Sequence, residues 1–161
     1  MKAHKLKLNE IINVASSERE AEFFIDLQSH TFALIEIDQG DNDVEVEIRR
    51  ADRTVLGVVD SRERGPQFVS ICAPNGGFHS VGTRLREAVT NGSYTAKLIK
   101  LGAQNDDDAD LAMAEQICTE ARKLLHAAPP KTGARPALDL YFQAIPVLER
   151  INNPLLLEIQ C

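Results

Sequence analysis

The sequence predicts a mainly β protein: an antiparallel β-sandwich or jelly roll of seven or eight strands, followed by two to three α-helices. Apolar and polar residues alternate through much of the first 102 residues, most strictly over residues 43–49. A period of two indicates strands with one buried and one solvated face. Turn-forming residues separate these runs, and from about residue 105 the apolar residues recur at helical spacing instead. We therefore expect a sandwich over residues 1–102 and a helical extension over residues 103–161.

The expected strands are short and follow one another closely. After a candidate strand at residues 6–12, the runs lie at residues 22–27, 31–37, 43–49, 54–59, 67–73, 78–85 and 93–101. The runs at 43–49 and 54–59 are separated by a turn-like spacer and predict a hairpin. Tyr94 lies in the last run, where we expect its hydroxyl at the surface. Seven or eight such strands with turns between them are typical of a sandwich or jelly roll.

Two helices are expected after residue 105, and the start of a third. The first covers about residues 106–127, and the aspartates that open it suit the positive end of a helix dipole. Its apolar positions recur at helical spacing, at Ala109, Met113, Ile117, Ala121 and Leu124. Consecutive prolines then separate it from a second helix over residues 134–151, which Pro146 should kink or end early. Residues 155–160 have the pattern of the first turns of a third helix.

The composition excludes several classes of protein. A net charge of −6 argues against a general nucleic-acid binder, which needs clustered Lys and Arg to meet phosphates. No segment approaches the roughly 18 to 20 apolar residues of a membrane span. Cys72, Cys118 and Cys161 match no zinc pattern, and we expect free thiols. We expect a soluble protein, cytoplasmic unless an export signal has been trimmed from ahead of Met1.

The order of these elements resembles a known family. Residues 21–27 match an opening strand, residues 42–48 the place of an Asp-rich third strand, and Gly92-Ser93-Tyr94 a recurrent Gly-x-Tyr before the last strand. Residues 5–102 thus resemble the bacterial pre-peptidase C-terminal-like sandwich, in the form found ahead of tetratricopeptide repeats. The resemblance implies a bacterial protein and is one of pattern and order.

The helical part resembles the lead-in to a repeat array. Residues 135–144 alternate small and large residues as a tetratricopeptide helix does. Proteins with this arrangement often end in a caspase-like CHAT peptidase domain, so the resemblance implies that the chain is the N-terminal part of a longer protein. One helix and the start of another are visible here, whereas a stable array needs about three repeats.

An apolar face over residues 134–157, on the second helix and the start of the third, is the candidate interaction surface. It comprises Leu140, Tyr141, Ala144, Leu148 and Leu155. In a complete array this face would pack on the next repeat. In this chain, packing against its own helix at 106–127 is favoured, and a homodimer through the helical tail is the second interpretation.

An acidic turn is the candidate metal site. Asp38, Asp41 and Asp43 lie between two predicted strands, and oxygen ligands of this kind suit Ca²⁺. The spacing is not that of a dedicated calcium loop, so a plain structural turn is favoured over a metal site. The acids at 106–108 and 110 are interpreted as helix capping in the same way.

No catalytic residues are predicted. His4, His30, His79 and His126 have no motif partner, and the adjacent His79 and Ser80 should point to opposite faces of a strand. No nucleophile elbow, zinc-protease motif or phosphate-binding glycine loop occurs. We therefore expect no enzyme and no cofactor.

The sequence favours a non-catalytic interaction or ligand-sensing module. Its partner would be another protein or further domains of the same protein, because a sandwich leaves its loops and edges free for recognition. The alternative is a calcium- or glycan-binding accessory domain of an exported enzyme.

Overall fold

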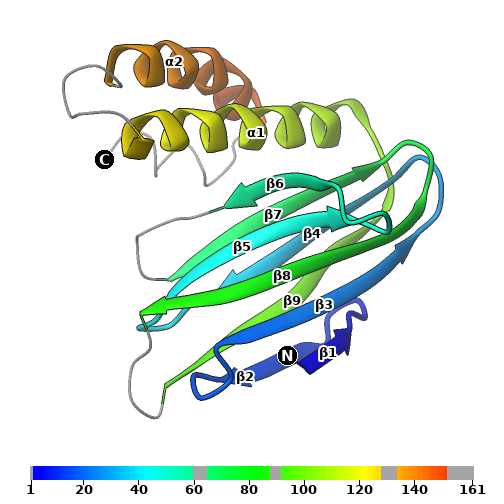
Figure 1. The fold of residues 1–161 in the computed structure, drawn as a ribbon. Helices are drawn as coiled ribbons and strands as arrows, with labels where there is room; N and C mark the ends of the chain where they lie inside the picture. The colour runs from blue at the N-terminus through cyan, green and yellow to red at the C-terminus, as the bar shows by residue number, and fades with distance from the viewer. Residues whose placement is uncertain (1, 60–64, 88–91, 128–133, 152–161) are drawn as a thin grey trace. The chain divides into compact units, whose positions relative to one another are not determined.

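The computed structural model describes residues 2–59, 65–87, 92–127 and 134–151. The chain divides into two compact units, Met1–Gln104 and Asn105–Cys161. Among the described residues the first unit is built of strands and the second of two helices (Figure 1). The predicted fold class, a β-sandwich followed by an α-helical extension, is confirmed.

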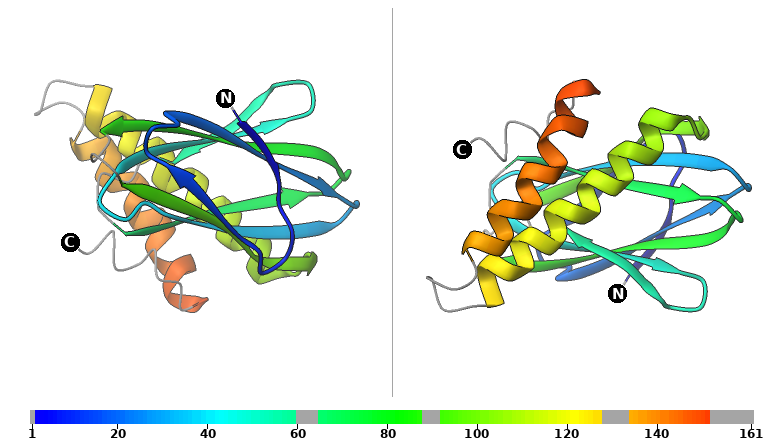
Figure 2. Two further views of the ribbon diagram at one scale, coloured as in Figure 1. Left: turned by 90° about the horizontal axis from the view of Figure 1, so that it is seen from below. Right: turned by 90° about the horizontal axis from the view of Figure 1, so that it is seen from above.

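The strands form two sheets that lie face to face (Figure 2). The five-stranded sheet has the order β1 (Lys2–Lys5), β3 (Glu20–Leu27), β8 (Gly77–Glu87), β5 (Asp43–Arg50), β6 (Val55–Val59). The four-stranded sheet has the order β2 (Ile11–Ala15), β9 (Ser93–Ala103), β4 (Thr31–Asp38), β7 (Pro66–Ala73). All pairings between these neighbours are antiparallel except β1 with β3.

The described residues contain one strand more than the upper end of the predicted range, because the N-terminal segment forms two strands and not one. A turn closed by the Glu10 amide and the Lys7 carbonyl, with Asn9 at a φ of 63°, interrupts the predicted run at residues 6–12. Leu6 before this turn is buried in the core. As a result β1 joins one sheet and β2 joins the other.

The core lies between the sheets and follows the period-two pattern. On β5, Val44, Val46 and Ile48 are buried, while Glu45 and Glu47, which alternate with them, are partly exposed. Each buried aliphatic side chain of this kind contributes about 1.5 to 3 kcal/mol. The alternation therefore sets which side of each strand faces water.

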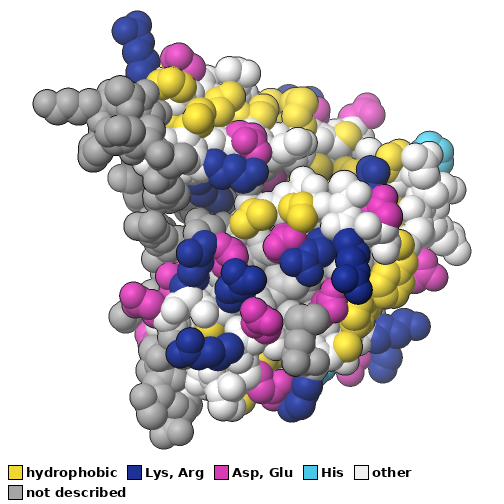
Figure 3. All heavy atoms as spheres, in the orientation of Figure 1, with side chains coloured by type: hydrophobic (Ala, Val, Ile, Leu, Met, Phe, Trp, Pro, Cys, Tyr) yellow, Lys and Arg dark blue, Asp and Glu magenta, His cyan; other side chains and the backbone are white. Residues whose placement is uncertain are grey.

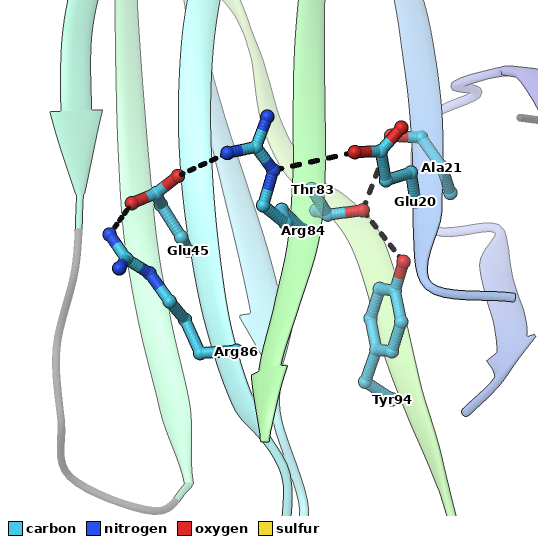
Figure 4. Close-up of polar contacts among 7 residues, drawn as sticks. All are labelled: Glu20, Ala21, Glu45, Thr83, Arg84, Arg86 and Tyr94. Carbon is cyan, nitrogen blue, oxygen red and sulfur yellow. Dashed lines mark hydrogen bonds and ion pairs between the residues drawn. The ribbon is translucent and has the colours of Figure 1, made fainter. Parts of the chain in front are cut away.

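Tyr94 corrects one expectation, because its hydroxyl is not at the surface. Its side chain is 1% exposed and belongs to the buried series of β9, with Ala96 and Leu98. The hydroxyl lies 2.6 Å from that of Thr83 on β8, and the Thr83 hydroxyl donates to the Ala21 carbonyl on β3 (Figure 4). The tyrosine thus joins the two sheets through a polar contact inside the core.

The second unit contains α1 (Asp106–Ala127) and α2 (Ala134–Arg150), which pack on each other. A reciprocal capping pair begins α1: Asn105 Oδ1 accepts from the Asp108 amide at 2.8 Å, and Asp108 Oδ2 accepts from the Asn105 amide at 3.1 Å. Pro146 lies inside α2, and the helix continues to Arg150, so of the two expected effects the early end is wrong, and the kink stays a prediction.

The predicted third helix, at residues 155–160, lies outside the described residues. Neither described helix is both long and apolar enough to cross a membrane.

Candidate functional site

The outer face of the five-stranded sheet carries three rows of side chains that run across the strands. This outer face is defined by the side chains that point away from the core on β3, β8, β5 and β6. The strand register sets the rows: Glu20, Arg84 and Glu45; then Glu22, Gly82, Glu47 and Val58; then Phe24, Ser80, Arg49 and Val55. Residues far apart in the sequence therefore become neighbours on one surface.

The first row is an exposed ion-pair ladder (Figure 4). Arg84 Nε lies 3.4 Å from Glu20 Oε1, and Arg84 Nη1 lies 4.0 Å from Glu45 Oε1. Arg86 contacts Glu45 from its other side. Because Arg84 is largely exposed, each of these pairs contributes at most about 1 kcal/mol. The ladder neutralises its own charges and leaves little net attraction for a ligand.

Gly82 leaves an open space in the middle row. A Cβ atom at Gly82 would lie 4.0 Å from Arg49 Nη1 and 3.8 Å from the Glu47 carbonyl oxygen, so the Arg49 guanidinium extends toward this glycine. The space is a hollow of about 180 Å³, the glycine hollow, bordered by the ion-pair ladder. The absent side chain gives the face its concave shape here.

Arg49 is held firmly as a cation. Its Nε donates to Glu47 Oε1 at 2.6 Å. This hydrogen bond is the main cause that raises the pKa of the Arg49 guanidinium above its ordinary value; partial burial opposes the shift, and the negative charges of Glu47 and Glu22 add to it. A group held in this state suits charge recognition and not proton transfer.

A larger hollow of about 730 Å³, the hairpin hollow, lies at the third row. It is lined by Glu22, Phe24, Glu47, Arg49, Arg50, Ala51, Arg53, Val55, Phe78 and Ser80. The Phe24 and Phe78 rings lie 5.2 Å apart at an angle of 33°. Phe78 is 44% exposed and Val55 49% exposed. In Figure 3 hydrophobic side chains lie beside Lys and Arg side chains on the surface facing the viewer.

The β5–β6 turn supplies the cationic rim of the hairpin hollow. The Arg53 amide donates to the Arg50 carbonyl at 2.9 Å, and Arg53 has a φ of 66°. Asp52 Oδ1 accepts from the Thr54 amide at 2.9 Å, a bond that lowers the pKa of this carboxyl. Arg50 and Arg53 are both exposed, and no ion pair to another described residue is found for either.

The predicted metal residues lie in and on either side of the turn between β4 and β5. Asp38 and Asp41 are exposed, Asp43 is half-buried, and Asp38 Oδ1 accepts from the Gly40 amide at 3.1 Å. The buried Gln39 and Asn42 hold this turn through the Val44 amide and the Ser93 carbonyl. Within the described ranges, no three His, Cys, Asp or Glu side chains gather as metal ligands would. Calcium binding here stays a prediction.

The predicted interaction residues of α2 lie in different environments. Ala144 and Leu148 are fully buried, Leu140 and Tyr141 are half-buried, and Leu155 lies outside the described residues. The exposed apolar side chains of this helix are instead Leu138, at 51%, and Phe142, at 66%. Apolar residues lie on several sides of α2, so the helical period did not distinguish the buried side from the exposed one.

The histidines in the described part of the sandwich have structural surroundings. The ring of His4 stacks on Phe23, with centroids 5.6 Å apart. His79 is buried, with Nδ1 3.0 Å from the Gly77 carbonyl oxygen, and His30 occupies a turn with a φ of 56°. His126 lies near the end of α1, and its side chain is outside the described part. None of these contacts resembles a nucleophile–base pair.

Comparison with solved structures yields distant likenesses. The chain is similar to the pre-peptidase C-terminal domain of a collagenase from Bacillus anthracis, with 9% identity and a TM-score of 0.42 over 62% of this chain and 94% of that one. It is also similar to the periplasmic g-type lysozyme inhibitor PliG of Aeromonas hydrophila, with 8% identity and a TM-score of 0.39 over 60% and 97% of the two chains.

A third likeness is to the C-terminal domain of the sugar-binding protein EclA, with 10% identity and a TM-score of 0.39 over 60% of this chain and 79% of that one. No protein-family model matches the chain, and no curated protein matches it. With TM-scores below 0.5, none of these likenesses assigns a ligand to the chain.

Proposed function

We propose that the chain is a non-catalytic binding module and that the outer face of its five-stranded sheet is the binding surface. The observation that carries this proposal is the hairpin hollow, where a partly exposed aromatic pair meets a cationic rim. Binding sites commonly combine apolar walls with a few placed polar groups. Exposed aromatic and arginine side chains are also the types that dominate protein-binding energies.

The electrostatics of the face favour binding over catalysis. The charges of the first row neutralise one another, and Arg49 is held as a cation by Glu47. General acid–base catalysis needs a group whose pKa lies near the working pH. The pKa of Arg49 is raised, which moves it further from neutral pH, so the residue offers a permanent charge and not an exchangeable proton.

Chemical-shift mapping tests this proposal. A small-molecule fragment library would be titrated into ¹⁵N-labelled protein, and the amides that move would be assigned. We expect the shifts to gather around Phe24, Val55 and Phe78 and to disappear in Phe78→Ser. Phe142→Ser, which removes an exposed phenylalanine from the helical unit, is the matched control and should leave them unchanged. Shifts scattered over the whole sandwich would overturn the proposal.

A glycan-binding accessory domain is the second candidate function. The exposed ring of Phe78 favours it, because an aromatic face can stack a sugar ring, and the carboxylates of Glu22 and Glu47 lie in the same hollow to accept hydroxyl hydrogen bonds. Titration with neutral oligosaccharides and separately with Ca²⁺ tests it. Shifts at Phe78 on adding sugar would support it. Shifts at Asp38–Asp43 on adding Ca²⁺ would favour the calcium-binding form of this candidate function.

The helical unit is proposed to connect the sandwich to other helices. Leu138 and Phe142 lie one turn apart and leave an exposed apolar strip on α2. Such a strip suits the next helix of a tetratricopeptide array, within a longer protein that ends in a CHAT peptidase, or the same strip of a second copy. Measuring the molar mass of the chain distinguishes these two occupants.

A further inference from the structure

We infer that the ligand of the hairpin hollow is an acidic protein segment that places an apolar side chain beside its carboxylates. This inference rests on the proposed function and names the partner of the same surface. It follows from the distribution of charge on the outer face, from the shape of the hollows and from an unusual residue in the β5–β6 turn.

The cationic groups are concentrated at one end of the face. Arg49, Arg50 and Arg53 all line the hairpin hollow, and among the described residues of its lining the acids are Glu22 and Glu47. Glu47 is already engaged by Arg49. Arg50 and Arg53 are both exposed; the charge of Arg50 acts on Asp52 in the same turn, so Arg53 is the more available of the two to ligand carboxylates. In a chain whose net charge is −6, a local excess of positive charge on an apolar hollow favours an anionic partner.

The first row limits where an anionic partner is attracted. Glu20 and Glu45 stand there, beyond the hairpin hollow, and the arginines of the ion-pair ladder neutralise them. A polyanion such as a nucleic acid would therefore gain no further attraction along this part of the face. A segment with a short acidic stretch is sufficient, because its carboxylates meet the arginines of the hairpin hollow while its apolar side chain lies against Phe24, Phe78 and Val55.

The shape of the surface favours a segment over a compact small molecule. The hairpin hollow adjoins the glycine hollow, and the two share Glu47 and Arg49 in their linings. Phe78 and Val55 are nearly half exposed, so a ligand seated on them stays in contact with water on one side. Small-molecule sites usually enclose about 70 to 90% of their ligand. A shallow pair of adjoining hollows suits a chain that lies across them.

The backbone conformation of Arg53 supports an acidic ligand independently of the charge distribution. Arg53 closes a three-residue loop between Arg50 and Thr54 and has positive φ, the conformation that glycine adopts without strain in this kind of hairpin. An arginine there costs stability that a glycine would not. Its side chain lines the hairpin hollow, where it gives the ligand a charge that glycine would not provide.

The experiment uses the full chain and a fluorescein-labelled peptide, Ser-Asp-Leu-Asp-Phe-Asp-Glu-Ser, in anisotropy titrations. The comparison peptide replaces each acid by its amide. We expect the acidic peptide to bind about tenfold more tightly than the amide peptide, and its affinity to fall as salt rises. Phe78→Ala should weaken the binding of both peptides.

Arginine variants locate the effect. Arg53→Gly and Arg50→Gln are each expected to weaken the acidic peptide about threefold to fivefold. Lys123→Gln, which removes an exposed positive charge from α1 in the helical unit, is the matched control and should not weaken it. Arg53→Gly should also unfold at a denaturant concentration no lower than the wild type, which separates lost binding from lost folding.

The outcomes distinguish a failure of the acidic-segment inference from a failure of the proposed binding surface. Equal affinity for the two peptides, or no effect of Arg53→Gly, would overturn the acidic-segment inference. If neither peptide binds but fragments or oligosaccharides still shift Phe78, the inference fails and the binding surface survives. If an oligothymidylate binds more tightly than the acidic peptide, the charge argument is wrong. If nothing moves the amides of the hairpin hollow, both proposals fail.

Discussion

The hydroxyl of Tyr94, in the four-stranded sheet, lies 2.6 Å from the hydroxyl of Thr83, in the five-stranded sheet. The Thr83 hydroxyl donates its single proton to the Ala21 carbonyl at 3.3 Å, so the Tyr94 hydroxyl must donate to Thr83. All three groups are buried. Because Tyr94 donates and Thr83 accepts, removing one hydroxyl should change the free energy of unfolding by a different amount from removing the other.

The first prediction is that Thr83→Val destabilises the protein more than Tyr94→Phe. Removing the tyrosine hydroxyl leaves Thr83 bonded to Ala21 and should cost about 1 kcal/mol. Removing the threonine hydroxyl leaves the buried Tyr94 hydroxyl without its acceptor and should cost about 2 to 3 kcal/mol. Urea unfolding of both variants and of the double variant measures this. The double variant should cost less than the sum of the two; strict additivity would show that the hydroxyls do not interact.

The second prediction concerns alkaline pH. Burial is the main cause that raises the pKa of the Tyr94 phenol above its ordinary value, and the negative charge of Glu18 adds to this shift. Above a pH of about 10 the unfolded chain releases this proton while the folded chain keeps it, so stability should fall as pH rises. Unfolding of wild type and Tyr94→Phe from pH 8 to 11, roughly, shows the difference. The wild type should lose more stability, and parallel curves would contradict the assignment.

The third prediction compares two glycines. At Gly76 a Cβ atom would lie 2.7 to 2.9 Å from the backbone of residues 27–29, and φ is +66°. Gly76→Ala should therefore cost about 2 kcal/mol or more. At Gly82 a Cβ atom meets nothing closer than 3.8 Å, so Gly82→Ala should stabilise the strand by about 0.5 to 1 kcal/mol. Thermal unfolding ranks the two variants, and equal effects would be inconsistent with these geometries.

The fourth prediction separates the aspartates at the start of α1. Asp108 takes part in the capping pair with Asn105, whereas Asp107 is exposed. Asn105→Ala and Asp108→Ala should each cost the helical unit about 1 kcal/mol, and Asp107→Ala only a few tenths. Far-UV circular dichroism during thermal unfolding measures the loss of helix. An equal effect of all three substitutions would mean that general acidity, and not capping, stabilises this end.

The fifth prediction is that the exposed strip on α2 pairs two copies of the chain. Light scattering across a range of concentrations should show the molar mass rising toward that of a dimer. Phe142→Ser should keep the chain monomeric, because this side chain is 66% exposed and is one of the two that form the strip. Met113→Ser, at an exposed apolar position on α1, is the control. A wild type that stays monomeric would exclude the dimer and leave the strip to further repeats.

The sandwich could be predicted because the alternation of apolar and polar residues within a strand shows which of its two sides is buried. In β5 the alternation of Val44, Val46 and Ile48 with charged residues sets the buried face without reference to any other strand. The same rule applied to Tyr94, Ala96 and Leu98 would have placed the tyrosine inside. The expectation of a surface hydroxyl considered the polar group alone and not the series it belongs to.

The outer-face site could not be predicted, because it depends on the order of the strands. Glu22, Gly82 and Glu47 form one row only because β8 lies between β3 and β5. A period of two shows which side of a strand is solvated, but it does not show which strand lies beside it. On α2 the difficulty was different: Leu140 and Phe142 are both apolar, and the packing of the helix on α1 decides which is covered.

The N-terminal segment has a consequence for how the protein is made. Its two strands reach across to different sheets, and β2 takes β9 as its partner. On a ribosome β2 must therefore wait for β9 to emerge before it can pair, whereas β1 can pair as soon as β3 has emerged. Until β9 emerges, the inner faces beside β2 stay open to other chains. The interval between the synthesis of β2 and that of β9 is when the four-stranded sheet is most exposed to misfolding partners.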